Sequence, residues 1–184
     1  MPVLQLLFGT DPELRKKAEP VADVNDDIRS NITDMFESLY EYRGIGIGAN
    51  MVGIFKRIIV IDLQEDSNKN PIAMVNPKIT WRSDTVAKHE EASLCFPGIS
   101  AEISRPDGIE VEYLDEQGET KSMKAEGWLA TVIQHEMDYL DGKSYLDHLS
   151  KMKKDRLIKK MVKMQKQHTP NQSCCEDPNC STNH

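Results

Sequence analysis

The sequence lacks the features that are typical of secreted proteins, of membrane-spanning proteins and of proteins with a broadly basic surface for nucleic acid. It has only 4 cysteines, and Cys174, Cys175 and Cys180 all lie close to its C-terminus, which does not resemble a disulfide framework. No apolar run approaches the roughly 18 residues of a membrane helix. The apolar start, residues 1–10, has no basic stretch before it and no small-residue cleavage site after it. We therefore expect a cytoplasmic protein, or one of an organellar matrix, without a membrane partner.

Positive charge is scarce except in one segment. The formal net charge is −7, which argues against a broadly basic surface and against DNA as a partner. Residues 150–167 nevertheless carry eight basic side chains against Asp155 alone. Such asymmetry favours an anionic partner for this segment, and the alternative is a solvated basic face.

Periodicity predicts an α+β architecture with mostly antiparallel sheets, because strands occupy the middle of the chain and helices both ends. Apolar residues at three- and four-residue steps predict a helix over residues 26–42, and helical patterns recur at 127–140 and 150–167. Short β-branched or alternating runs predict strands at residues 57–63, 71–80 and 109–113, with a hairpin turn at 112–120.

Length and composition predict one domain, residues 1–167, followed by a tail, residues 168–184, that is disordered or loosely attached. Cys174, Cys175, Cys180 and His184 offer soft metal ligands in that tail. Their spacing matches no strong metal motif, so we favour a flexible, oxidation-sensitive tail. A metal-handling or redox role through these residues remains the alternative.

Three segments stand out for their chemistry: GIGIGANM at residues 44–51, EEASLCFP at 90–97 and QHEMDYLDG at 134–142. In this order and spacing they resemble the signature motifs of peptide deformylases, and the resemblance extends over residues 8–167. Members of that family remove the formyl group from the N-terminal methionine of nascent chains. They use a divalent metal, usually iron, held by one cysteine and two histidines. The resemblance implies antiparallel sheets around a central HExxH-type helix, with N-terminal and C-terminal helices.

The metal-ligand positions of the family depart from its pattern here. Ser93 stands at the cysteine position and Tyr139 at the second histidine, so that only His135 is retained. An alcohol stays protonated at neutral pH and is a far poorer ligand than a thiolate, and a phenol has an ordinary pKa of about 10. If residues 93–95 are extended, Cys95 is displaced from Ser93 by about 6.5–7 Å along the strand and cannot replace the thiolate.

The catalytic positions are partly kept. Met51 replaces a glutamine that helps to hold the oxyanion, and it has no donor to offer. Losing one such donor typically costs on the order of 10²–10³ in rate. Glu136 keeps the general-base position, and the backbone N–H expected from Leu94 does not depend on a side chain. We expect Tyr139 and Met51 to fill the site.

These departures predict a deformylase-like protein that has lost hydrolysis and has no cofactor. Its expected partners are peptide N-termini or, through residues 150–167, the ribosome, because in one class of bacterial deformylases the C-terminal helix binds the ribosome. The alternative is an active hydrolase with altered ligands. It would hold Fe²⁺ or Zn²⁺ with His135, Tyr139 and, after a register slip, Cys95, and would use Glu136 as base.

Overall fold

The computed structural model describes residues 3–65 and 68–168, so the predicted tail lies outside the described residues except for its first position. The described helices are α1 (Asp26–Glu41), α2 (Gly127–Leu140) and α3 (Lys151–His168). The strands are β1 (Gly46–Gly48), β2 (Ile58–Ile61), β3 (Ile72–Arg82), β4 (Val86–Ser93), β5 (Phe96–Pro106), β6 (Gly108–Leu114) and β7 (Thr120–Glu126). No helix in this part of the chain is long and apolar enough to cross a membrane.

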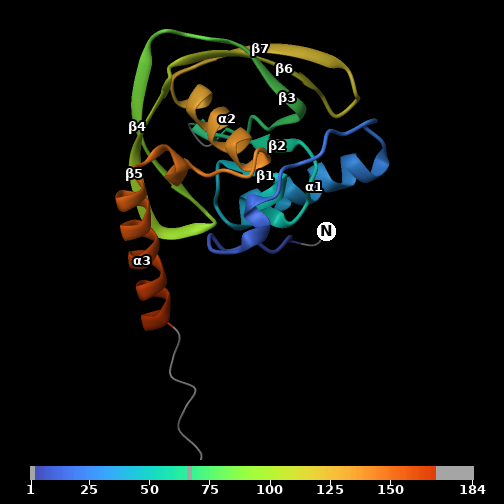
Figure 1. Ribbon diagram of the computed structural model, residues 1–184. Coiled ribbons are helices and arrows are strands. Elements are labelled where there is room, and N and C mark those ends of the chain that lie inside the picture. The colour runs from blue at the N-terminus through green and yellow to red at the C-terminus, as the bar shows by residue number, and fades with distance from the viewer. Residues whose placement is uncertain (1–2, 66–67, 169–184) are drawn as a thin grey trace, which may run out of the picture.

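The strands form two antiparallel sheets, which confirms the predicted α+β class. One sheet has five strands in the order β1-β2-β3-β6-β7, and the other is the β4-β5 hairpin. Helix α2 lies between them and contacts strands of both (Figure 1). Nine of its 14 residues are buried, as expected for a helix packed on more than one side. The HExxH-like segment is therefore held in the centre of the molecule.

Local signals explain the ends of the other elements. The Asn25 side chain accepts from the Ile28 N–H and caps α1. Of its predicted apolar positions, Ile28, Ile32, Met35 and Leu39 are buried and Tyr40 is partly buried. The predicted turn between β6 and β7 is confirmed, with the Asp115 carboxylate accepting from the N–H groups of Gln117 and Glu119. Gly118 completes that turn at φ 82°, a value that favours glycine.

The β4-β5 hairpin corrects one sequence-based assumption. Ser93 pairs with Phe96, so Leu94 and Cys95 form the turn between the strands and are not extended. The Cys95 N–H donates to Ser93 Oγ at 3.3 Å. The displacement of about 6.5–7 Å that an extended strand would give therefore does not apply. Nothing in the turn marks it in the sequence, because neither residue is a glycine or proline.

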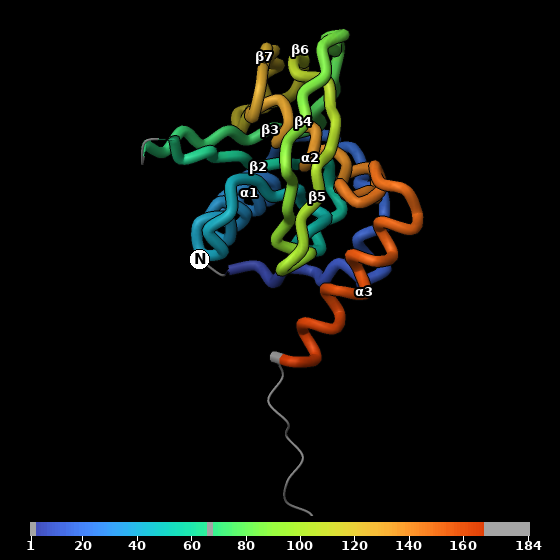
Figure 2. Tube along the Cα trace, turned by 90° about the vertical axis from the view of Figure 1, so that its left-hand side faces the viewer, coloured from blue at the N-terminus to red at the C-terminus, as the bar shows by residue number. Residues whose placement is uncertain are grey.

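Helix α3 docks along β5 and extends beyond the rest of the fold (Figures 1 and 2). The predicted docking stripe is confirmed: Met161 is fully buried, and Leu157, Ile158 and Val162 pack against the main hydrophobic core. The basic side chains lie mostly on the other faces of the helix. The helix therefore presents positive charge to solvent from a fixed position on the body.

Candidate functional site

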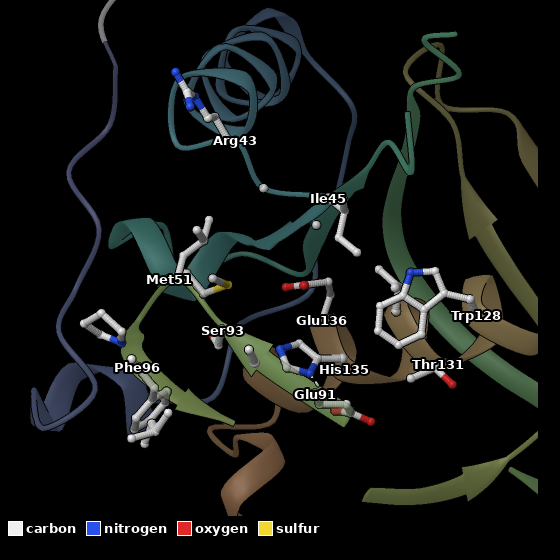
Figure 3. Close-up of a pocket in the computed structure, with 18 residues that line it drawn as sticks. Arg43, Ile45, Met51, Glu91, Ser93, Phe96, Trp128, Thr131, His135 and Glu136 are labelled. Atoms are coloured by element: carbon white, nitrogen blue, oxygen red, sulfur yellow. Dashed lines mark hydrogen bonds and ion pairs between the residues drawn. The ribbon is translucent and has the colours of Figure 1, made fainter. Parts of the chain in front are cut away.

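A cavity of about 370 Å³ opens where the three sequence motifs meet (Figure 3). The first motif supplies one wall through residues 44–46 and Met51, the β4-β5 hairpin supplies the second, and α2 supplies the third. Among the residues singled out in the sequence, the lining includes Met51, Ser93, Leu94, His135 and Glu136. The fold thus brings together three segments that lie far apart in the chain.

Tyr139 and Ser93 are joined by a hydrogen bond behind this cavity. The two hydroxyl oxygens are 2.6 Å apart, and the Tyr139 side chain is fully buried. Burial raises the pKa of the Tyr139 phenol well above its usual value, and the hydrogen bond with Ser93 lowers it only in part. The two hydroxyls therefore share one hydrogen bond, which links the β4-β5 hairpin to α2.

A buried ionic network orients His135. Its Nδ1 lies 2.7 Å from Oε2 of Glu91. The Glu91 carboxylate also accepts two hydrogen bonds from Arg105, at 2.7 Å on Oε1 and at 2.9 Å on Oε2. Arg105 contacts Asp138 as well, at 2.9 Å, and Asp138 is held by His148. Burial opposes ionisation of Glu91, but hydrogen bonds from His135 and Arg105 outweigh it and lower its pKa to about 2. Glu91 is thus an anion with all its partners in place.

Sequence reasoning missed Glu91 and Arg105 as part of the site. They are 14 residues apart, and only the pairing of β4 with β5 brings them together. No signal in the sequence indicated this pair, because only the structure shows that the carboxylate and the guanidinium are almost fully buried, at 1% and 4% exposure. Charged residues are rarely buried to that degree unless they are paired.

Glu136 differs from Glu91 because it has no ion pair and one of its carboxyl oxygens has no hydrogen-bond partner within the described residues. Its side chain is 4% exposed, and Oε2 has no hydrogen-bond partner among the described residues. Burial raises the pKa of Glu136 to about 7, while His135 and the Gly48 amide lower it. Gly46 allows this position, since a Cβ there would lie 2.6 Å from Glu136 Oε1. The carboxyl group faces the cavity between Ile45 and Met51 (Figure 3).

Met51 fills the wall beside Glu136. The side chain is 1% exposed, and its sulfur accepts a hydrogen bond from the Gly48 N–H at 3.3 Å. A thioether has no hydrogen to donate. At this point of the wall the cavity therefore offers an apolar surface and a weak acceptor, and no side-chain donor.

Comparisons with known proteins agree with this architecture. The sequence model of the polypeptide deformylase family matches residues 3–155. The chain belongs to the peptide deformylase family. It is 47% identical over 169 residues to a protein of Rickettsia conorii named peptide deformylase-like, and 92% of each chain is covered. Peptide deformylase 1 of Burkholderia multivorans is 44% identical over 166 residues, covering 90% of this chain and 91% of the relative.

Solved deformylase structures share the fold. The crystal structure of the Ehrlichia chaffeensis peptide deformylase in complex with actinonin superimposes with a TM-score of 0.85 at 38% identity. The match covers 90% of this chain and 99% of the other. The predicted family and its fold are therefore confirmed.

The residues present do not fit the deformylase metal. Within residues 3–65 and 68–168, no group of three or more His, Cys, Asp or Glu side chains could hold a metal ion. Cys95 lies next to the Ser93 hydroxyl, to which its backbone N–H donates a hydrogen bond. Burial, however, raises the pKa of the Cys95 thiol to about 12, and the Glu136 carboxylate adds to the rise. Because metals bind the thiolate, this buried thiol is a poor replacement for the family cysteine.

Proposed function

We propose that this deformylase-family protein no longer removes formyl groups and instead binds peptide N-termini in the same pocket. The observation that carries the proposal is the 2.6 Å hydrogen bond between Ser93 and Tyr139. These two residues stand where the family has a thiolate and an imidazole. Two hydroxyls that share one hydrogen bond supply neither the negative charge nor the soft donor atoms that iron or zinc prefers.

The remaining groups cannot replace the lost chemistry. Glu136 could accept a proton from water, but general-base catalysis alone typically contributes about 10²–10⁴-fold. Met51 has no donor that could hold a developing oxyanion, and the loss of such a donor typically costs about 10²–10³ in rate. Binding is less affected, because the cavity and its apolar walls are intact.

We expect no deformylation of a formyl-methionyl peptide by the purified protein, with or without added Fe²⁺, Ni²⁺ or Co²⁺. Release of formate measured over hours should equal that of buffer, because neither a metal-bound nucleophile nor a side-chain oxyanion donor can form. The Burkholderia multivorans relative, assayed in parallel, controls for the substrate and the metals. A turnover number above about 0.1 s⁻¹, a hundredth of the typical enzyme value, would favour the active hydrolase with His135 and Tyr139 as ligands.

We also propose that α3 binds the ribosome or another RNA-rich surface. The supporting observation is that its apolar stripe is docked while most of its cationic side chains are exposed. No ion pair within the described residues neutralises Lys153, Lys159, Lys160 or Lys163, whereas Lys154 pairs with Asp147. A positive helix on an otherwise acidic protein directs that face towards an anionic surface.

Reversing these four charges to glutamate should abolish sedimentation with ribosomes at low salt and leave the unfolding temperature nearly unchanged. For the wild-type protein, log affinity should fall with log salt with a slope of about −0.7Z to −0.9Z for Z phosphates neutralised. The control reverses four exposed lysines elsewhere, Lys17, Lys78, Lys88 and Lys143, and so changes the net charge equally. Equal loss in both variants would show that only net charge matters, and no loss in either would contradict the proposal.

A further inference from the structure

We propose that the pocket prefers peptides with a free amino terminus to formylated peptides, because the terminal ammonium pairs with Glu136. This inference rests on the proposed function, that the pocket binds peptide N-termini, and adds which chemical form it takes. The protein would then recognise peptide chains from which a hydrolase has already removed the formyl group.

The first argument is the balance of donors and acceptors in the cavity. A formyl group presents a carbonyl oxygen, which needs donors, whereas an ammonium presents three donors and needs acceptors. The Ser93 and Tyr139 hydroxyls share one hydrogen bond, and the Met51 sulfur only accepts. Beside Glu136 the lining includes Ile45 and Met51, and neither side chain can donate to a formyl oxygen. The wall therefore suits an ammonium better than a carbonyl.

The second argument is the unpartnered carboxyl group itself. Glu136 lines the cavity and is only 4% exposed. Its Oε2 has no hydrogen-bond partner in the described part of the chain. A buried polar group without a partner is costly, so a ligand that supplies the missing donor gains that free energy on binding. Figure 3 shows the carboxyl group directed towards the cavity, between Ile45 and Met51.

Two carboxyl groups and the Arg43 guanidinium line the cavity, and of the two carboxyl groups only Glu136 has no ion pair within the described residues. The nearby carboxylate, Glu91, is fully engaged by Arg105 and His135. A divalent cation would need several oxygen ligands and would find one free carboxyl group. A single positive charge with three N–H donors matches a single carboxylate.

The apolar part of the lining defines the rest of the ligand. Ile45, Leu94, Trp128 and Val132 line the cavity near Glu136, and the cavity volume of about 370 Å³ accommodates a side chain beyond the terminal amine. We therefore expect an apolar first residue, such as methionine, to be held by burial of its side chain. A small free amine without that side chain should bind far more weakly.

The test compares three short peptides of one sequence beginning with methionine: with a free amino terminus, N-formylated and N-acetylated. Isothermal titration calorimetry with the full chain at pH 7 should give a dissociation constant for the free peptide roughly thirtyfold lower than for either blocked peptide, as for a buried charge pair. Equal or tighter binding of the blocked peptides would overturn the proposal. This comparison uses the wild-type protein and does not depend on a variant folding.

Glu136→Gln should remove most of the preference by weakening the free peptide roughly thirtyfold and leaving the acetylated peptide nearly unchanged. Glu90→Gln, at an exposed position within strand β4, is the matched control and should keep the full preference. A preference that survives in the Glu136 variant would refute the role of this carboxyl group.

The proposed function and the preference for a free amino terminus would be contradicted by different results. Hydrolysis of the formylated peptide would overturn the loss of deformylation, while the acetylated peptide would still test the preference. Blocked peptides that bind while the free one does not would leave the proposed function standing and overturn the inference. No binding of any of the three peptides would overturn both.

Discussion

The double variant Ser93→Cys/Tyr139→His should bind about one equivalent of Zn²⁺ more than the wild-type protein. The structure places the two positions against each other, since their hydroxyl oxygens are 2.6 Å apart. Together with His135 the variant would offer one thiolate and two imidazoles, which is a three-ligand set typical of a zinc site with one open position.

The supporting groups for such a site are already present. His135 has its Nδ1 engaged by Glu91 at 2.7 Å, which leaves Nε2 as the nitrogen available to a metal. A carboxylate behind a ligating imidazole fixes its orientation and raises its basicity. Replacing the buried Tyr139 removes volume from the core, so the variant without metal should be less stable than the wild type. Added Zn²⁺ should raise its unfolding temperature.

The measurement is metal content after dialysis, determined by atomic emission, with unfolding temperature as a second readout. Because the wild-type protein carries the same native cysteines, the difference between the two proteins isolates the new site. Ser93→Cys alone should retain no additional metal, since it still lacks the second imidazole. Met51→Gln alone should retain none either, since it only adds an amide. If the double variant folds but gains no metal, the family motifs have been aligned wrongly onto this site.

The helices and the fold class could be predicted because their signals are local. The apolar steps of α1 and the docking stripe of α3 follow from a period of 3.6 residues and from burial of one face. The same applies to the β6-β7 turn, where Asp115 and Gly118 supply ordinary turn chemistry. Such features need no knowledge of distant contacts.

The contents of the site were less predictable, because they depend on pairs far apart in the chain. The motifs named His135 and Glu136 but could not show that one is held by Glu91 while Oε2 of the other has no hydrogen-bond partner in the described part of the chain. Nor could they show that Gly46, on β1, lies against Glu136, on α2, where a Cβ would be 2.6 Å from Oε1. The turn at Leu94 and Cys95 was missed because the nearest glycine and proline, Gly98 and Pro97, lie within β5 and not at the turn itself.

Replacing Arg105 with methionine should destabilise the protein by about 3–5 kcal/mol, the cost typical of breaking a buried ion pair. Glu91 would lose two hydrogen bonds and its main countercharge at 1% exposure. Methionine keeps much of the volume of the side chain, so lost packing is a minor part of the effect. Since folded proteins are typically stable by about 5–15 kcal/mol, the loss is a large fraction of the total.

Chemical denaturation at pH 7 measures the effect, and a companion variant separates charge from shape. Combining Arg105→Met with Glu91→Gln should recover more than half of the loss, because the amide removes the unpaired charge while its oxygen still accepts from His135. Arg57→Met is the matched control: its pair with Asp141 is more exposed, at 20% and 51%, and should be worth about 1 kcal/mol or less. If the Arg105 and Arg57 variants lose equal stability, the buried network contributes no more than a surface pair, and His135 must be oriented by packing rather than by Glu91.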